Sequence, residues 1–368
     1  MADIKVTVVM PIYNAYDYLR PALDSVIDQT LREIEIICID DGSTDPTLNL
    51  LKEYQKADER IRIVTENNAG VSVARNKGLV RARGEYVIFL DADDFFELTL
   101  LEKLYNAAKE SELDITVCGY DMYNDKAARF EECVDGEEGR FPAGEVVSKG
   151  TLQDGIFQST TSYVWNKLFK TSFLRDKELN FAPELYVFED VYFILTTLSM
   201  AQRVGKISDN LIHHRIYSTQ SRPKLFKKYY HQVPLVYKKT KDFLTAHGTY
   251  IPLSRSFLNV SVSRCYKIYN LLWHDAKGSF FDILHDGYAD MLGWFAHEAQ
   301  EFESEELYEF AASVGLYTHE QYKKLAHRQK KSGIGRIGKD GLNRKIRIMR
   351  KRERIKLFFK RIFGRKKH

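Results

Sequence analysis

Three acidic residues stand directly after an apolar run in the first third of the chain. Residues 86–90 read Tyr-Val-Ile-Phe-Leu, and Asp91, Asp93 and Asp94 follow them. Such a run is typical of a parallel strand covered on both faces, and parallel sheets bind ligands beyond the carboxyl ends of their strands. Carboxylates this close repel one another, so a site that keeps them ionised usually holds a cation. A hard divalent metal ion is the natural occupant, although one Asp could instead cap a helix at 97–108.

A second acidic pair follows an earlier strand. Residues 34–39 form an apolar strand pattern, and Asp40 and Asp41 come next, before the turn residues 42–46. In a parallel sheet this pair lies at the same edge as Asp91 and Asp93. A carboxylate there can accept a hydrogen bond from the N3–H of a pyrimidine or from ribose hydroxyls. The alternative is that Asp40 or Asp41 holds a turn.

A polar turn lies between the two acidic pairs. Asn67, Asn68, Ala69 and Gly70 lead into a helix that begins near residue 71 and carries Arg75 and Lys77. Glycine allows a close backbone approach, and a helix N-terminus attracts anions, so this turn can face a diphosphate. Solvated basic side chains are the alternative.

These turns require a regular series of strands and helices to hold them. Strands alternate with helices, which predicts an α/β fold with a parallel, doubly wound sheet. The first strand-to-helix turn, residues 11–16, contains neither a GxGxxG nor a GxxxxGK[ST] pattern, which disfavours a dinucleotide-dependent dehydrogenase and a P-loop enzyme. The expected strands are 5–12, 34–39, 61–65, 86–90 and 114–120, and the expected helices are 16–29, 46–57, 71–82 and 98–109.

Further motifs follow in the next hundred residues. Residues 161–170 form an aromatic and basic cluster that precedes a short helix at 172–176. Glu189 and Asp190 begin an apolar helix that runs to residue 200, where acidic residues also complement the helix dipole. Short strands are expected at 204–207 and 210–217, and the second of these contains His213 and His214.

In this order, the motifs resemble the family 2 glycosyltransferases of bacterial polysaccharide synthesis, which have the Rossmann-like nucleotide-diphosphosugar transferase fold called GT-A. The resemblance covers residues 4–220. Its motifs are VVMPIYN at 8–14, DDGSTD at 40–45, NAG at 68–70, ARNKG at 74–78, DADD at 91–94, WNKLF at 165–169 and ED at 189–190.

The resemblance implies roles for individual residues. Asp91 and Asp93 would bind Mn2+ or Mg2+ together with the diphosphate, and His213 or His214, with His214 favoured, would approach the metal unless it is structural. Asp190, beside Glu189, would be the general base. Trp165, Asn166 and Lys167 would bind the acceptor, although a core Trp is the alternative for Trp165. The implied nucleotide-sugar site comprises Pro11, Tyr13, Asn14, Asp40, Asp41, Asn68, Gly70, Arg75, Asn76, Asp91, Ala92 and Asp93.

These roles agree with the chemistry of sugar transfer. Displacing UDP from an anomeric carbon requires neutralisation of the leaving diphosphate and a carboxylate that takes the acceptor's proton. We therefore expect an inverting hexosyl- or N-acetylhexosaminyltransferase that uses a UDP-sugar and a glycan acceptor, usually lipid-linked in this family. The alternative is a non-catalytic protein of the same fold that binds nucleotide sugars or glycans.

The charge of the chain is divided unevenly. Residues 328–368 contain 18 Lys or Arg and two acidic residues, a net charge of +16 that leaves −12 for the remainder. In a helix over 343–363, Ile355, Phe358, Phe359 and Ile362 would share one face, as in basic amphipathic helices that lie on anionic membranes. Such a tail could also bind nucleic acid, but phosphate binding does not explain the apolar face.

These patterns predict three regions, a GT-A catalytic domain at 1–222, a helical domain at 223–327, and a basic amphipathic tail at 328–368 that follows a glycine-rich hinge at 333–341. The helical domain would shape the acceptor site or mediate homo-oligomerisation. Four widely spaced cysteines with no CxxC pair indicate free thiols in a reducing compartment. No secretory leader or run of about 18 apolar residues occurs, so we expect a cytoplasmic protein, peripheral on the inner face of the membrane.

Overall fold

The computed structural model of the protein describes residues 3–131, 142–216 and 223–324. The chain divides into two compact units. The first unit contains residues 1–229 and 243–253, and the second contains 230–242 and the chain from 254 onward. The first unit includes α7 (Pro223–Tyr229).

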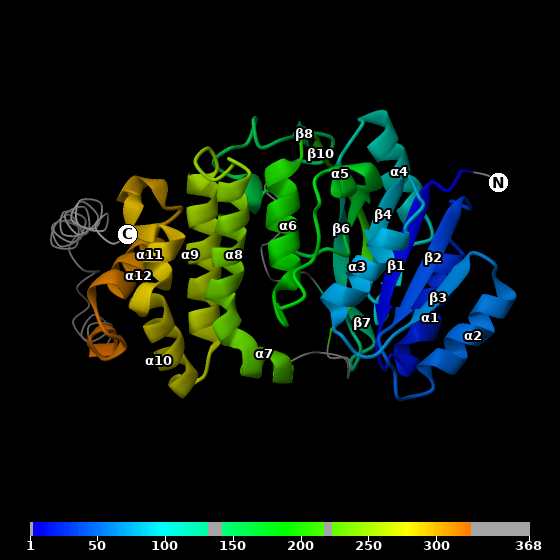
Figure 1. Ribbon diagram of the computed structural model, residues 1–368, viewed down its shortest axis with the longest axis horizontal. Coiled ribbons are helices and arrows are strands. Elements are labelled where there is room, and N and C mark those ends of the chain that lie inside the picture. The colour runs from blue at the N-terminus through cyan, green and yellow to red at the C-terminus, as the bar shows by residue number, and fades with distance from the viewer. Residues whose placement is uncertain (1–2, 132–141, 217–222, 325–368) are drawn as a thin grey trace, which may run out of the picture. The chain divides into compact units, whose positions relative to one another are not determined.

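The first unit is built on one mixed sheet (Figure 1). Its strand order is β3-β2-β1-β4-β9-β6-β10-β5, with β7 beside β6 and β8 beside β10. The strands are β1 (Val6–Ile12), β2 (Ile34–Asp40), β3 (Ile61–Thr65), β4 (Tyr86–Phe89), β5 (Phe95–Phe96), β6 (Ile115–Asn124), β7 (Arg129–Glu131), β8 (Val146–Val147), β9 (Lys167–Lys170) and β10 (Val204–Ile216).

The expectation of a parallel sheet is correct for one part and wrong for another. Strands β3, β2, β1 and β4 are parallel, as the α/β alternation requires. However, β9 runs antiparallel to both β4 and β6. The four residues of β9, bounded by lysines, are too few to show an alternating pattern. The two short strands expected at 204–207 and 210–217 are one irregular strand, β10.

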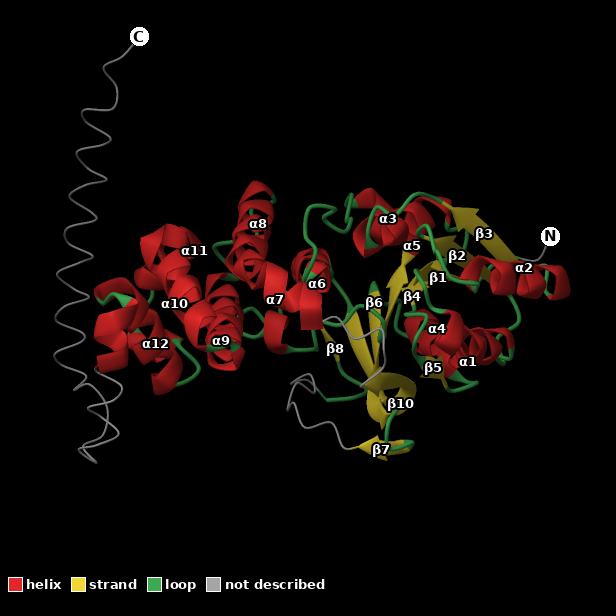
Figure 2. Ribbon diagram, turned by 90° about the horizontal axis from the view of Figure 1, so that it is seen from below, coloured by secondary structure: helices red, strands yellow, loops and turns green. Residues whose placement is uncertain are grey.

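Helices cover both faces of this sheet (Figure 2). Side chains from α1, α2 and α4 pack with β1, β2 and β4 in one core cluster, whereas Ala74 of α3 packs on Ile37 and Ile39 of β2 from the other face. The predicted helices of this unit are all present. They are α1 (Tyr16–Ile27), α2 (Thr47–Ala57), α3 (Val71–Arg81), α4 (Leu100–Glu110), α5 (Thr171–Asp176) and α6 (Glu189–Met200).

The second unit is helical, as expected. Phe257, Cys265, Phe280 and Phe281 are buried in its core, and the indole N–H of Trp294 donates to the Ser261 hydroxyl at 3.0 Å. Its main helices are α9 (Ser254–Leu271), α10 (His274–Ile283), α11 (Ala289–Leu292) and α12 (Glu305–Leu316), while α8 (Val233–Ala246) is divided between the two units.

Some expectations fall on residues outside the described ranges, namely the hinge at 333–341, the amphipathic segment at 343–363 and Cys133. The three described cysteines, Cys38, Cys118 and Cys265, are buried free thiols. Within the described ranges, no helix is both long enough and apolar enough to cross a bilayer.

Gly78 allows α3 to pack directly on β1, which leads to a stability prediction. A Cβ at Gly78 would lie 2.2 Å from Cγ1 of the fully buried Val9. We expect Gly78→Ala to lower the free energy of unfolding by about 1–3 kcal/mol, because overpacking a stiff core forces neighbours to move. Val80→Ala, at a position of α3 that is 73% exposed, should change it by less than about 0.5 kcal/mol. Equal unfolding curves in urea for both variants would contradict this packing argument.

Candidate active site

Parallel register brings the acidic turns to one edge of the sheet. Ile12 of β1 lies beside Asp40 of β2, and Val9 of β1 lies beside Phe89 of β4. The backbone N–H of Asp41 donates to the carbonyl of Ile12 at 2.8 Å, which ties the two strand ends together. The residues that follow β1, β2 and β4 therefore meet at this edge, as the sequence predicted.

The turn after β1 presents a partly exposed aromatic ring. Tyr13 is 44% exposed, and Pro11 is half-buried within β1. Asn14 has a φ of 49°, in the left-handed region that Asn tolerates, and its side-chain oxygen accepts from the backbone N–H of Thr44 at 2.7 Å. Asn14 thus holds the turn, while the neighbouring Tyr13 ring remains accessible.

Asp40 and Asp41 are buried and both accept hydrogen bonds from backbone amides. The two carboxylate oxygens of Asp41 accept from the N–H groups of Ala69 and Gly70 at 2.7 and 2.9 Å. The carboxylate of Asp40 accepts from the N–H of Ser43 at 3.3 Å. Asp41 therefore makes the turn-holding contacts that the sequence left open as an alternative.

The loop that Asp41 holds leads into α3. Gly70 is the N-cap of α3 and has a φ of 91°, a conformation that favours glycine, and Asn68 beside it is exposed. Asn76 points elsewhere, because its amide donates to the carbonyl of Phe181 and accepts from the N–H of Phe181, both at 2.9 Å. Both polar atoms of Asn76 thus hold the backbone at Phe181.

Arg75 lies at the centre of the site. Its side chain is 2% exposed, and its guanidinium donates to Asp91 at 2.9 Å, to Asp190 at 2.6 Å and to Glu189 at 3.4 Å. Burial opposes its charge, but the three carboxylates raise the pKa of Arg75 above its ordinary value. We expected this side chain to face a diphosphate; in the structure it joins Asp91 to the residues that begin α6.

The start of α6 is a strained junction. Phe188 is its N-cap and has a φ of 59°, which bulky residues avoid and which costs on the order of 1–3 kcal/mol. Glu189 is buried and Asp190 is half-buried, and Arg75 bonds both. Strained backbone is concentrated at functional sites, so this geometry is compatible with the role expected for Asp190.

The residues after β4 have different environments. Ala92 and Asp94 are buried, whereas Asp91 and Asp93 are half-buried. Burial, together with the charges of Asp94 and Asp91, raises the pKa of Asp93 to about 7. A cation beside Asp93 would favour its ionised form, so the donor set fits a divalent metal. In the described part of the chain, no three His, Cys, Asp or Glu side chains are already grouped to hold an ion. Arg75 bonds one oxygen of Asp91.

Asp94 is the partner of His214, a link that sequence reasoning missed. Its carboxylate lies 3.0 Å from Nδ1 of His214 and also accepts from the N–H of Arg215 at 2.8 Å. Burial would lower the pKa of His214, but Asp94 raises it to about 9. A carboxylate on one ring nitrogen commonly orients a metal-binding His, so Nε2 of His214 is the atom suited to a ligand role.

The three residues expected to contact the acceptor are all buried. Trp165 is 2% exposed and stacks on Tyr163 at 4.8 Å and on His214 at 5.1 Å, measured between ring centroids. Asn166 donates to the carbonyl of Cys118 at 3.0 Å and accepts from Nζ of Lys167 at 2.7 Å. This arrangement favours the core-packing alternative for Trp165.

Lys167 is a buried cation without an acidic partner among the residues that bond it. Its Nζ donates to the carbonyls of Thr161 and Tyr163 at 2.8 and 2.6 Å, and to Asn166. Burial lowers the pKa of Lys167 to about 7. Lys167 therefore fixes the loop before β9 and cannot reach a ligand in this conformation.

Comparisons with known proteins agree with the site geometry. The model of the family described as "Glycosyl transferase family 2" matches residues 7–170. The putative glycosyltransferase EpsH of Bacillus subtilis is 30% identical over 250 residues, covering 65% of this chain and 69% of EpsH. Glycosyltransferase GlyA of Streptococcus pneumoniae is 32% identical over 222 residues, covering 59% of this chain but only 31% of GlyA.

Solved structures show the same fold. S. aureus TarS 1–349 in complex with UDP has a TM-score of 0.68 at 22% identity, covering 90% of this chain and 92% of that chain. The same TarS fragment in complex with UDP-GlcNAc has a TM-score of 0.66 at 21% identity, covering 87% and 92%. At this identity the likeness establishes the GT-A-like fold.

The charge balance around Arg75 leads to a prediction. We expect Arg75→Met to lower the free energy of unfolding by about 3–5 kcal/mol, because it leaves buried carboxylates without their cation. Combining it with Asp190→Asn should restore part of that loss, since one of the uncompensated charges is removed. Urea unfolding followed by tryptophan fluorescence would measure both. A double variant less stable than Arg75→Met would contradict the proposed balance.

Proposed function

Because the chain belongs to the family 2 glycosyltransferases, we propose that it moves one sugar from a UDP-sugar to a glycan acceptor with inversion at the anomeric carbon. The observation that carries the proposal is the sheet edge where Arg75 joins Asp91 to Asp190. Asp91, proposed to act at the leaving diphosphate, and Asp190, proposed to take the acceptor's proton, thus bond two different nitrogens of one guanidinium. A single displacement needs both.

The donor would lie along the ends of β1, β2 and β4. The exposed ring of Tyr13 can pack on the uracil base, with Pro11 and Asn14 shaping the turn beneath it. Both carboxylate oxygens of Asp41 already accept hydrogen bonds from the backbone at residues 69–70, whereas Asp40 accepts from the backbone N–H of Ser43. Asp40 is therefore better placed than Asp41 to accept a hydrogen bond from uridine. Asn68 and Gly70 would then approach the diphosphate at the start of α3.

We further propose that Mn2+ or Mg2+ binds with the diphosphate. Asp93, Asp91 and Nε2 of His214 would hold the ion, and Ala92 between the two acids leaves room beside them. When bound, such an ion neutralises negative charge on the leaving UDP. Magnesium and its analogues are commonly held by one or two carboxylates plus phosphate oxygens, which suits a site with no preformed protein cage in the described residues.

Asp190 would act as the general base. Its carboxylate accepts from Arg75 at 2.6 Å, which would hold it in place to take a proton from the acceptor hydroxyl. Glu189 shares that guanidinium and would help to fix its position. Trp165, Asn166 and Lys167 would support the acceptor side indirectly, by fixing the loop and the His214 ring.

The acceptor is proposed to be a glycan, usually lipid-linked, of capsule, exopolysaccharide or other surface polysaccharide synthesis. Placement on the inner face of the membrane through the basic tail would bring the enzyme to such an acceptor. In the proposed reaction Asp190, held by Arg75, would take the acceptor's proton, a role that a nucleotide-sugar-binding protein would not need.

Two substitutions separate the proposed roles. We expect Asp190→Asn to abolish sugar transfer and to leave UDP affinity within about threefold, because the base does not contact the nucleotide. Asp93→Asn should weaken manganese-dependent UDP binding by about tenfold or more, equivalent to about 1.4 kcal/mol. Calorimetric titration of UDP with and without manganese measures affinity, and UDP release from a panel of UDP-sugars measures turnover.

The control for these variants is Glu110→Gln, an exposed position at the end of α4, which should behave as the wild type. Equal loss of UDP binding in Asp190→Asn and Asp93→Asn would contradict the assignment of Asp190 as the base. Absence of UDP binding by the wild-type protein would overturn the proposed donor.

Deletion of residues 342–368 tests the membrane proposal. We expect the full chain to sediment with phosphatidylglycerol vesicles and the deleted chain to remain in solution, because each basic residue near an anionic surface contributes about 1 kcal/mol. Neutral phosphatidylcholine vesicles are the control for charge. Unchanged sedimentation after the deletion, or preferential binding of the tail to DNA, would reject membrane attachment.

A further inference from the structure

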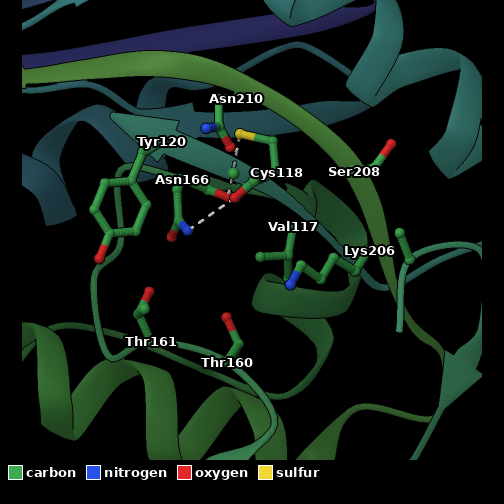
Figure 3. A pocket seen from close by; sticks show the side chains of 11 residues that line it. Val117, Cys118, Tyr120, Thr160, Thr161, Asn166, Lys206, Ser208 and Asn210 are labelled. Atoms are coloured by element: carbon green, nitrogen blue, oxygen red, sulfur yellow. Dashed lines mark hydrogen bonds between the residues drawn. The ribbon is translucent and has the colours of Figure 1, made fainter. Parts of the chain in front are cut away.

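A cavity of about 190 Å³ opens beside β6 and β10 in the first unit (Figure 3). It includes none of the residues assigned above to the donor, the metal or the base. Of the proposed acceptor residues, only Asn166 reaches it. Its lining consists of Val117, Cys118, Gly119, Tyr120, Ala143, Thr160, Thr161, Asn166, Lys206, Ser208 and Asn210.

The cavity has a structural cause in the pairing of two strands. The register between β6 and β10 shifts between Lys206 and Asn210 and again between Asn210 and Ile212. At this irregularity Gly119 faces Asn210, and a Cβ on Gly119 would lie 2.0 Å from the Asn210 side-chain oxygen. The bulged strand thus leaves a space that depends on a glycine.

Two polar groups that face this space make no hydrogen bond to a described residue. One is the hydroxyl of Thr160, a residue that is 7% exposed, and the other is the ammonium of Lys206. Figure 3 shows the Thr160 hydroxyl and the Lys206 ammonium pointing into the same space.

The charge in the cavity is positive. No described residue in its lining is acidic. Of the carboxylates nearby, Asp209 pairs with Lys103, and Asp121 accepts from the Asn210 side chain at 2.7 Å. Glu145 stands across from Lys206 where β8 pairs with β10, but it is exposed and lies outside the lining. Within the described residues, Lys206 therefore brings the only charged side chain in the lining.

The opposite wall of the cavity is rigid. Thr161 and Asn166 belong to the loop that Lys167 holds through hydrogen bonds to the Thr161 carbonyl and the Asn166 side chain. Asn166 is further fixed by its bond to the carbonyl of Cys118 in β6. A ligand would thus meet a preformed surface, which lowers the entropic cost of binding.

We propose that this cavity binds a phosphate ester of the acceptor. An ammonium group with adjacent hydroxyl donors is a suitable receptor for a phosphoryl group, because charge-assisted hydrogen bonds to phosphate are about twice as strong as neutral ones. A volume of about 190 Å³ equals that of roughly six water molecules, enough for a phosphate and a short polyol or sugar fragment.

The cavity is connected to the active site through aromatic contacts. Tyr120 lines the cavity and makes an edge-to-face contact with Trp165 at 4.9 Å, and Trp165 stacks on His214. The identification of the occupant as part of the acceptor rests on the proposed function. The phosphate ester itself could come from a lipid-linked diphosphate or from a polyol-phosphate chain.

Calorimetric titrations of the full chain test this proposal. The probes are sn-glycerol 3-phosphate, glycerophosphoglycerol as a chain fragment, isopentenyl diphosphate as a lipid-diphosphate head, and glycerol as the neutral control, each with saturating UDP and manganese present. We expect at least one phosphorylated probe to bind and glycerol not to bind. Tighter binding of glycerophosphoglycerol would identify a polyol-phosphate chain as the source of the phosphate, and tighter binding of isopentenyl diphosphate would identify a lipid-linked diphosphate.

Variants locate the binding. Lys206→Gln should lower the affinity for the phosphorylated probe by about tenfold, and Thr160→Val should lower it by about threefold. Lys52→Gln makes the same charge change at an exposed position of α2 and should leave the affinity for the probe unchanged. All three should keep the UDP affinity of the wild type. If the wild-type protein binds the phosphorylated probe but does not bind UDP, the proposed donor is refuted and the cavity assignment stands.

Three results would overturn the cavity assignment. The first is no binding of any phosphorylated probe. The second is binding that Lys206→Gln leaves unchanged. The third is binding that appears only without UDP, because competition would place the phosphate in the donor site.

Discussion

The structure of the site depends on one buried guanidinium. Arg75 compensates Asp91, Glu189 and Asp190, which come from segments that lie about a hundred residues apart in the chain. Burying one cation and several anions is expensive unless their hydrogen bonds satisfy one another. Arg75 reaches all three carboxylates because its planar guanidinium has donors on two terminal nitrogens, whereas the three donors of a lysine share one nitrogen; its Nε makes no hydrogen bond to a described residue. The same contacts set the position of Asp190 relative to Asp91.

The sheet supplies the second constraint. Parallel strands β2, β1 and β4 end at one edge, so every loop that follows them must share the same small region. Backbone amides there need acceptors, and Asp41 provides two for the 69–70 turn. Acidic residues at this edge consequently serve two purposes. Asp41 and Asp94 hold neighbouring backbone and side chains in place, while Asp91 bonds Arg75 and Asp93 is the residue proposed to meet a ligand.

The sequence predicted the elements of the first unit well because their periodicity is local. Alternating strands and helices and the acidic turns after residues 39 and 90 follow from neighbouring residues alone. The antiparallel β9 was missed because it has only four residues and its direction is set by distant pairing. The burial of Trp165 and the Arg75 contacts also depend on segments far away in the chain. A signal for the Arg75 contacts did exist, since an arginine on an α3 face that packs against the sheet requires buried acidic partners.

Two places in the first unit have local charge that a ligand of opposite sign would stabilise. At Asp93, burial and two neighbouring carboxylates raise the pKa to about 7, so the protein disfavours the ionised form. In the cavity, Lys206 faces the Thr160 hydroxyl, and none of the described lining residues is acidic. The ligands that would remove these imbalances have opposite charge, a cation at the first and an anion at the second. A transferase that binds a metal-diphosphate donor and a phosphorylated acceptor would need both, and ring contacts from Tyr120 to Trp165 and from Trp165 to His214 connect the two places.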